Sequence, residues 1–143
     1  MAQHPKFSVS VVTPEGPAFE GEAEMIIVPG AAGEIGVLAR HAPLVAMLNA
    51  GSTRVYIDQD AEDIKTFATG PGFFQVLEDR AIALVDDAVI ASEIDVERAR
   101  RQLDEAKAEL AQVVAGESTA DQWQLEQRIK HAENQLSVSG HSG

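Results

Sequence analysis

Apolar and polar residues alternate in short runs along the first 88 residues, as expected of half-buried β-strands. In the first run, Phe7, Val9 and Val11 share one face. Turn residues, mainly Gly, Pro, Asn and Asp, separate the runs. The pattern predicts strands at residues 6–13, 22–29, 35–38, 44–48, 53–57, 64–69, 73–77 and 80–85. Because no helix-length segment interrupts them, they favour an antiparallel sandwich or barrel over a doubly wound parallel sheet.

After Ala88 the apolar period becomes helical. One seam recurs at steps of three and four residues and consists of Val96, Ala99, Leu103, Ala106, Leu110 and Val113. Asp95 is placed to cap the start of this helix and Gly116 to end it. We expect Ser118 or Thr119 to cap a second helix. Its seam comprises Leu125, Ile129, Ala132 and Leu136. Because the connection is short, the two helices should form an antiparallel hairpin.

The change of period predicts three regions: a β-domain over residues 1–88, a two-helix domain over 89–137 and a frayed tail over 138–143. Alanine occupies several seam positions, so the hairpin buries few large side chains. Ordering its backbone costs free energy that this burial does not offset alone. We therefore expect the hairpin to depend on contacts with the β-domain or with a partner. Because these contacts could be exchanged, the hairpin should act as a movable arm.

Charge and composition exclude several classes of function. The chain has 23 acidic and 11 basic residues, a formal net charge of −12, which disfavours binding to nucleic acid or to anionic lipid. The longest apolar run, residues 42–48, is far shorter than the roughly 20 residues that span a bilayer, so no direct membrane insertion is expected. No signal-peptide pattern is visible. With no cysteine, disulfide frameworks and thiolate metal sites are absent.

Chemically active residue types occur without the spacing that catalytic sites need. The histidines form no i, i+4 metal-binding pair, so no metal site is expected. The glycines at 30–36 and 70–72 match neither a dinucleotide-binding loop nor a P-loop, and we interpret them as turns. No nucleophile motif such as Gly-x-Ser-x-Gly occurs. The sequence therefore predicts no catalytic residues, and an enzyme is disfavoured.

Arg98 stands out because it falls in the first turn of the first predicted helix. A cation there opposes the helix dipole by roughly 0.3–1 kcal/mol, yet it would suit an anion bound at the helix start. The alternative is a solvated helix face. On that interpretation Glu97 pairs with Arg101, and Arg100 pairs with Asp104, at i, i+4 spacing.

Particular residues in this order resemble the epsilon subunits of bacterial F-type ATP synthases, from about residue 7 to residue 136. The most specific stretch joins Gly33-Glu34-Ile35-Gly36 to His41-Ala42-Pro43-Leu44. The segment Thr69-Gly70-Pro71-Gly72 is similar to a second family motif, with Pro71 in place of a glycine. The resemblance implies a β-sandwich of about ten antiparallel strands, followed by a C-terminal antiparallel two-helix hairpin.

The resemblance also implies a non-catalytic rotor subunit. It would join the gamma subunit to the ring of c subunits on the cytoplasmic face of the bacterial membrane, as a peripheral component, and couple proton-driven rotation to ATP synthesis. By matching position, the rotor contacts would include Glu34, Gly36, His41, Ala42 and Pro43.

In the resembled family, the C-terminal helices extend toward the catalytic alpha and beta subunits and inhibit ATP hydrolysis. Here we expect the inhibitory contacts to be made by Arg98, Arg100, Arg101 and Lys107. Some family members also bind ATP through an Ile/Leu-Asp-x-x-Arg-Ala motif, which Ile94, Asp95, Arg98 and Ala99 match. Arg128 is an available cation on the second helix. We expect no required cofactor and at most weak, regulatory ATP binding.

A competing hypothesis is a binding module unrelated to a rotor. An acidic β-sandwich with a coiled-coil-like tail could serve as a scaffold and form a dimer through the first helical seam, residues 96–113. A rotor subunit should instead be a monomer that associates with a gamma subunit.

Overall fold

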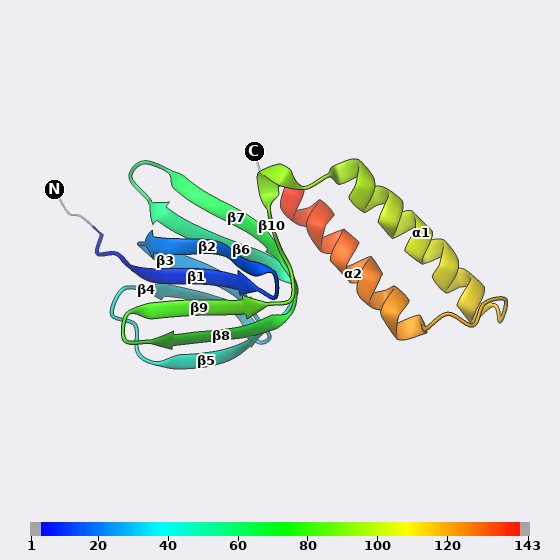
Figure 1. The fold of residues 1–143 in the computed structure, drawn as a ribbon, viewed down its shortest axis with the longest axis horizontal. Helices are drawn as coiled ribbons and strands as arrows, with labels where there is room; N and C mark the ends of the chain where they lie inside the picture. Colours follow the sequence, from blue (N-terminus) through cyan, green and yellow to red (C-terminus); the bar gives the residue numbers. More distant parts are fainter. Residues whose placement is uncertain (1–3, 141–143) are drawn as a thin grey trace.

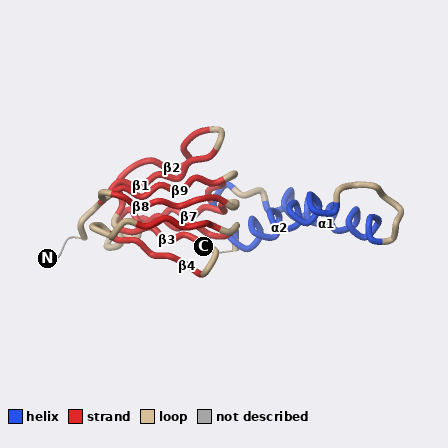
Figure 2. Tube along the Cα trace, turned by 90° about the horizontal axis from the view of Figure 1, so that it is seen from below, coloured by secondary structure: helices blue, strands red, loops and turns tan. Residues whose placement is uncertain are grey.

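The computed structural model describes residues 4–140 as a β-body from which a helical hairpin projects at one end (Figures 1 and 2). The strands are β1 Phe7–Thr13, β2 Gly16–Ala23, β3 Met25–Gly30, β4 Gly33–Leu38, β5 Leu44–Leu48, β6 Gly51–Asp58, β7 Asp63–Thr69, β8 Gly72–Leu77, β9 Arg80–Val85 and β10 Ala88–Ile90. A short 3-10 helix, Ala91–Glu93, leads into α1 Val96–Val114 and α2 Gln122–Ser139. The β-sandwich followed by two helices is therefore confirmed.

The ten strands form one sheet that folds back on itself, in the order β10-β7-β6-β3-β5-β8-β9-β1-β2, with β4 paired to β3. The sheet bends between β3 and β5, where Gly30 and Leu48 form the single paired position. Contacts of β2 with β6 and of β1 with β10 bring the two halves together on the other side. The result is a closed two-layer body whose interior is shielded by both halves.

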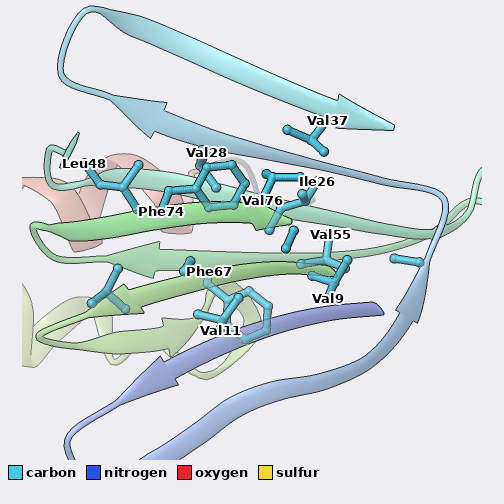
Figure 3. Packing of buried hydrophobic residues seen from close by; sticks show 14 of the residues in the cluster. Val9, Val11, Ile26, Val28, Val37, Leu48, Val55, Phe67, Phe74 and Val76 are labelled. Atoms are coloured by element: carbon cyan, nitrogen blue, oxygen red, sulfur yellow. The ribbon is translucent and has the colours of Figure 1, made fainter. Parts of the chain in front are cut away.

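The core of the body is built from inward-facing residues of both halves (Figure 3). Ile26, Val28 and Val55 come from one half, and Val9 and Phe74 from the other, all with no exposed surface. The alternation that predicted the strands follows from this arrangement, because every second side chain points inward. Burial of these side chains is the main source of the body's stability.

Two strands were not predicted from the alternation. β2 contains Gly16, Pro17 and Gly21, which weaken a strand pattern, yet it pairs antiparallel with β1 around a bulge at Val11 and Val12. β10 has three residues, too few for a period to be visible. Both lie at the ends of the strand path, where tertiary pairing decides the conformation.

One strand pair departs from the expected antiparallel arrangement. β1 pairs with β9 in parallel, for example at Val9 and Ala81, whereas every other strand pair between the described residues is antiparallel. The expectation of purely antiparallel strands was wrong here. Closing the body brings the first strand beside β9, and such a long-range pairing needs no hairpin.

The first helix begins and ends where the sequence predicted. The Asp95 carboxylate accepts a hydrogen bond from the Arg98 N–H at 3.0 Å, which confirms Asp95 as the N-cap. Gly116 has a φ of 78°, and its N–H donates to the Val113 oxygen at 3.1 Å. The N–H of the next residue, Glu117, donates to the Gln112 oxygen at 2.8 Å, completing a Schellman motif.

The second helix starts later than predicted. Its N-cap is Asp121, whose carboxylate accepts from the N–H groups of Trp123 and Gln124. Ser118 instead accepts from the N–H of Ala120 within the connecting turn. The predicted caps at Ser118 and Thr119 were therefore wrong, because the turn is two to three residues longer than the cap pattern implied.

The seam between the helices is filled mostly by small residues. Ala99, Ala106, Leu125 and Ala132 are buried between α1 and α2. Val96, which the sequence predicted to be part of the seam, is 41% exposed and does not belong to it. The close approach of two helices across alanine buries little apolar area, in agreement with the expected weakness of the hairpin.

The region boundaries also differ from the expected ones. The expected boundary after Ala88 falls inside β10, which continues the sheet to Ile90. At the other end α2 continues to Ser139, and Val138 is buried against the body, so residues 138–140 are not a frayed tail. Residues 141–143 of that expected tail lie outside the described residues.

Candidate functional site

The residues expected at the rotor contacts lie on β4 and on the loop that follows it. Glu34 and Gly36 belong to β4, whereas His41, Ala42 and Pro43 form the end of the loop before β5. All five are exposed. The loop lies at the end of the β-body away from the helices (Figure 1).

These five residues do not form one patch. Glu34 is the second residue of β4, near the helical end, and accepts hydrogen bonds from Arg54 of β6, with an N–O distance of 3.1 Å. The other end of β4 lies roughly 13 Å from Glu34, at about 3.3 Å per residue, and His41 follows that end. The structure therefore places His41, Ala42 and Pro43 together and Glu34 apart from them.

An exposed apolar face, which sequence reasoning missed, covers the outer side of β5, β8 and β9. Met47, Phe73 and Leu84 lie opposite one another across these strands. They are 62%, 36% and 49% exposed. Val45 and Leu77 extend the same outer side. We call these five residues the outer apolar face.

The outer apolar face has the character of an interaction surface. Contiguous exposed apolar side chains on a folded protein mark a surface that a partner covers. The sequence carries a signal for it, since β5 is apolar at every position and β8 begins Gly72-Phe73-Phe74. A strand of a two-layer body needs apolar residues on its inner side alone, so apolar residues on both sides indicate a second buried surface.

The residues of the predicted ATP motif are largely engaged in structure. Asp95 caps α1, Ala99 is buried in the helical seam, and Ile94 packs on a small apolar cluster at the foot of the hairpin. Arg98 is exposed. Because α2 runs back along α1, Arg128 lies beside residues 105–109 in the middle of the hairpin, about two and a half turns from Arg98. The structure does not bring Arg128 to the motif.

The cations expected to make inhibitory contacts are all accessible. Arg98, Arg100, Arg101 and Lys107 are exposed along α1. Among residues 4–140 the ion pairs are those of Arg54 with Glu34 and of His131 with Asp87. The alternative pairing of arginines with acids along α1 is therefore not formed, and these cations remain available to a partner.

The hairpin meets the β-body through few contacts, which we call the junction. The side-chain amide nitrogen of Asn134 donates to the backbone oxygens of Gly51 at 3.2 Å and Thr69 at 3.1 Å. His131 lies 3.7 Å from the carboxylate of Asp87. Val138 packs on a small apolar cluster that is separate from the core of the body. The expectation that the hairpin leans on the β-domain agrees with this geometry.

Asp86 at the junction carries a perturbed carboxyl group. Burial raises the pKa of Asp86 above its ordinary value of 3.8, repulsion from Asp87 raises it further, and the nearby His131 acts in the opposite direction. A side chain at Gly70 would collide with this carboxylate, since an added Cβ would lie 1.7 Å from the oxygen. The Asp86 carboxylate therefore occupies space that is open only because residue 70 has no side chain.

A groove of about 1140 Å³ separates the hairpin from the end of the body. Arg128 and Lys130 face it together with the acids Asp86, Glu105, Glu109 and Glu133. The four carboxylates outnumber the two cations, which disfavours a polyanion such as a triphosphate in this groove.

Metal-binding clusters and membrane spans are absent from the part of the chain that the structure describes. Within residues 4–140, no group of three or more His, Asp or Glu side chains is arranged to hold a metal ion. No helix in the same range combines the length and apolar character needed to cross a membrane.

Two family models match consecutive parts of the chain. The β-sandwich domain of the ATP synthase delta/epsilon chain matches residues 6–91, and the long α-helix domain of that chain matches residues 92–140. The ATP synthase epsilon chain of Halalkalibacterium halodurans is 37% identical over 136 residues, which cover 95% of this chain and 98% of the relative. The epsilon chain of Persephonella marina is 43% identical over 104 residues, covering 73% of this chain and 75% of the relative.

Solved structures share the architecture. A chain of the Euglena gracilis mitochondrial ATP synthase, solved with OSCP, F1 and c-ring, matches with a TM-score of 0.76 and 21% identity, covering 96% of this chain and 84% of that one. A chain of the Tetrahymena thermophila mitochondrial ATP synthase central stalk and c-ring matches with a TM-score of 0.60 and 11% identity, covering 96% and 99%. At these identities the likeness concerns the fold. Since the two family models together span nearly the whole sequence, the chain belongs to the ATP synthase delta/epsilon family.

Proposed function

We propose that the chain is the epsilon-type rotor subunit of an F-type ATP synthase and contributes contacts instead of catalytic groups. It would couple c-ring rotation to the gamma subunit at the cytoplasmic face of the membrane. Family membership over both domains supports the rotor role. The mechanical requirement for such a subunit is a stiff body with separate surfaces for its partners, and a close-packed β-core supplies the stiffness.

The outer apolar face is the observation that carries the assignment of a partner surface. Met47, Phe73 and Leu84 form a continuous apolar row across three strands. The row lies at the strand ends nearest the junction, two residues from Asn49, Pro71 and Asp86, which line the groove beside the hairpin. We assign this face to the gamma subunit, because an obligate rotor contact buries apolar side chains at its centre. The exposed loop with His41, Ala42 and Pro43 lies at the end away from the helices and is assigned to the c-ring.

The hairpin supplies the regulatory part of the proposal. Its foot rests on the body through the junction, and its cations Arg98, Arg100, Arg101 and Lys107 face solvent. A helix as long as α1, with 19 residues, extends for about 28 Å and could reach a distant partner once released. We propose that the released helices contact acidic groups of the alpha and beta subunits and inhibit ATP hydrolysis.

Replacing two side chains of the outer apolar face tests the proposed function. We expect Met47→Ser with Leu84→Ser to weaken binding of the purified chain to the gamma subunit by about 30- to 1000-fold, since exposed anchors at an interface centre each contribute on the order of 1–2 kcal/mol. Ile64→Ser is the matched control, because Ile64 is an exposed apolar residue on β7, outside that face. Binding would be measured by calorimetry, and unfolding by circular dichroism.

The same proteins decide between the rotor and the scaffold hypotheses. The rotor role predicts a monomer in size-exclusion chromatography that shifts to a complex when gamma is added. A stable dimer of the free chain, or equal gamma binding by the double variant and by Ile64→Ser, would contradict the proposed function.

A further inference from the structure

The turn between β8 and β9 adopts a conformation that its residues do not favour. Leu77 and Arg80 are paired, so the turn consists of Glu78 and Asp79 alone. Both are left-handed, with φ of 50° and 57°. A two-residue hairpin turn of this type requires positive φ at both positions and is usually made by Asn or Asp followed by Gly. Here neither residue is glycine, so the turn carries backbone strain.

The neighbouring loop is strained at one position as well. Arg40, two residues after the end of β4, has a φ of 64°. A long side chain in this conformation is uncommon and must be held by its surroundings. Arg40 directly precedes His41, Ala42 and Pro43, the exposed residues that we assign to the c-ring contact.

Asp79 joins these two strained segments. Its carboxylate oxygen accepts a hydrogen bond from the backbone N–H of Arg40, 39 residues away in the sequence. Its backbone oxygen accepts from the N–H of Ser8 in β1 at 3.1 Å. One residue therefore ties the loop after β4 to the β8–β9 turn and to the first strand.

We infer that Asp79 is a positioning residue for the rotor contact: it holds the loop of residues 39–43 in its binding conformation before the partner arrives. This inference rests on the proposed function. Glycine at position 79 would relieve the turn but would remove the carboxylate, which explains why an aspartate at a strained position is useful here. A loop ordered in advance avoids an entropic cost on binding, so the restraint strengthens the contact.

Three variants separate positioning from stability. Asp79→Gly relieves the turn and removes the acceptor. Asp79→Asn keeps a side-chain oxygen and tolerates the left-handed conformation. Glu78→Gly is the matched control, because it relieves the adjacent strained residue and leaves the bond to Arg40 intact. Each variant would be studied as the full chain and in complex with gamma.

Amide hydrogen exchange of the isolated chain measures the restraint directly. We expect the Arg40 amide of Asp79→Gly to exchange about tenfold faster than in the wild type. This is the change in rate that the loss of one charge-assisted hydrogen bond should cause. Asp79→Asn should exchange at an intermediate rate, because its amide oxygen still accepts the bond but carries no charge. Glu78→Gly should keep the wild-type rate. Equal exchange rates in Asp79→Gly and Glu78→Gly would overturn the inference.

Binding of the gamma complex to detergent-solubilised c-rings measures the consequence. Asp79→Gly should bind about three- to tenfold more weakly, although its melting temperature is equal to or above that of the wild type. Asp79→Asn should recover part of the binding, because its neutral amide oxygen still accepts the bond from Arg40. Unchanged binding by Asp79→Gly would overturn the positioning role. If the wild-type complex itself did not bind c-rings, the proposed function would fail instead, and the exchange rates would still decide whether Asp79 orders the loop.

Discussion

The side-chain amide of Asn134 donates to the backbone oxygen of Thr69 across 3.1 Å and so joins the C-terminal half of α2 to the end of β7. The same nitrogen lies 3.2 Å from the oxygen of Gly51. Beside these bonds, the junction has one ion pair and a small apolar cluster. A polar attachment of this kind can be exchanged for water or for a partner at low cost, whereas a continuous apolar core cannot.

Removing the Asn134 amide should loosen the hairpin. In Asn134→Ala both bonds to the body are lost, and we expect docking to weaken by about 1–2 kcal/mol. Hydrogen exchange in α2 should then become faster by about 5- to 30-fold, whereas exchange in the β-core should not change. Gln124→Ala, at an exposed position in the first turn of α2, is the control. Equal protection of α2 in both variants would show that the amide does not hold the hairpin.

The carboxyl group of Asp86 should make stability depend on pH. Because the pKa of Asp86 is raised in the folded state, the folded chain holds this proton more tightly than the unfolded chain. Its contribution to the free energy of unfolding therefore falls as the pH rises from the ordinary value of 3.8 through the raised folded value, and is constant above it. We expect Asp86→Asn to be more stable than the wild type at pH 7.

Urea unfolding at a series of pH values measures this effect. The advantage of Asp86→Asn should shrink as the pH is lowered and should vanish below 3.8, where the wild-type carboxyl is protonated in both states. Asp60→Asn, in an exposed turn, serves as the control. A wild type that is as stable as Asp86→Asn at neutral pH would contradict the assigned cause.

The exposed cations of α1 should carry inhibition of ATP hydrolysis. Replacing Arg98, Arg100, Arg101 and Lys107 with alanine removes four charges that would face acidic groups of the catalytic subunits. We expect higher hydrolysis by the assembled complex, by several-fold, with unchanged assembly. Lys130→Ala on α2 is a single-charge control. Deletion of residues 92–143 provides the upper limit of released activity, and a quadruple variant that hydrolyses ATP at the wild-type rate would rule out this role.

Binding of ATP should be weak or absent. The motif residue Asp95 is used as a helix cap, Ala99 is buried, and Arg128 lies about two and a half turns from Arg98. We therefore expect dissociation constants in the millimolar range or higher, which correspond to a binding free energy no more favourable than about −4 kcal/mol. Calorimetric titration checks this expectation, and Arg98→Ala should abolish any heat that is observed. Micromolar affinity would contradict it.

Much of the fold could be predicted from periodicity. The alternation in residues 6–13 and 80–85 reflects the inward and outward sides of β1 and β9. The steps of three and four after residue 95 reflect the buried seam of α1. Caps such as Asp95 and Gly116 depend on neighbouring backbone groups alone, so these boundaries could be placed from the sequence.

Other features depend on residues that are distant in the sequence. β2 is a strand because β1 lies beside it, although its glycines and proline disfavour one. The parallel pairing of β1 with β9 follows from closure of the body. The outer apolar face could not be located from the sequence, because one must know which side of β5, β8 and β9 packs on the core.

The sequence by itself determined the β-body, the helical hairpin and the family resemblance, because these depend on local periods and on short motifs. The tertiary structure alone decided that Asp79 reaches Arg40, that Asn134 reaches Thr69, and that Arg128 stays far from Arg98. The physical reason is that a hydrogen bond needs its two atoms within about 3 Å. Sequence spacing does not encode that distance once the chain has folded back on itself.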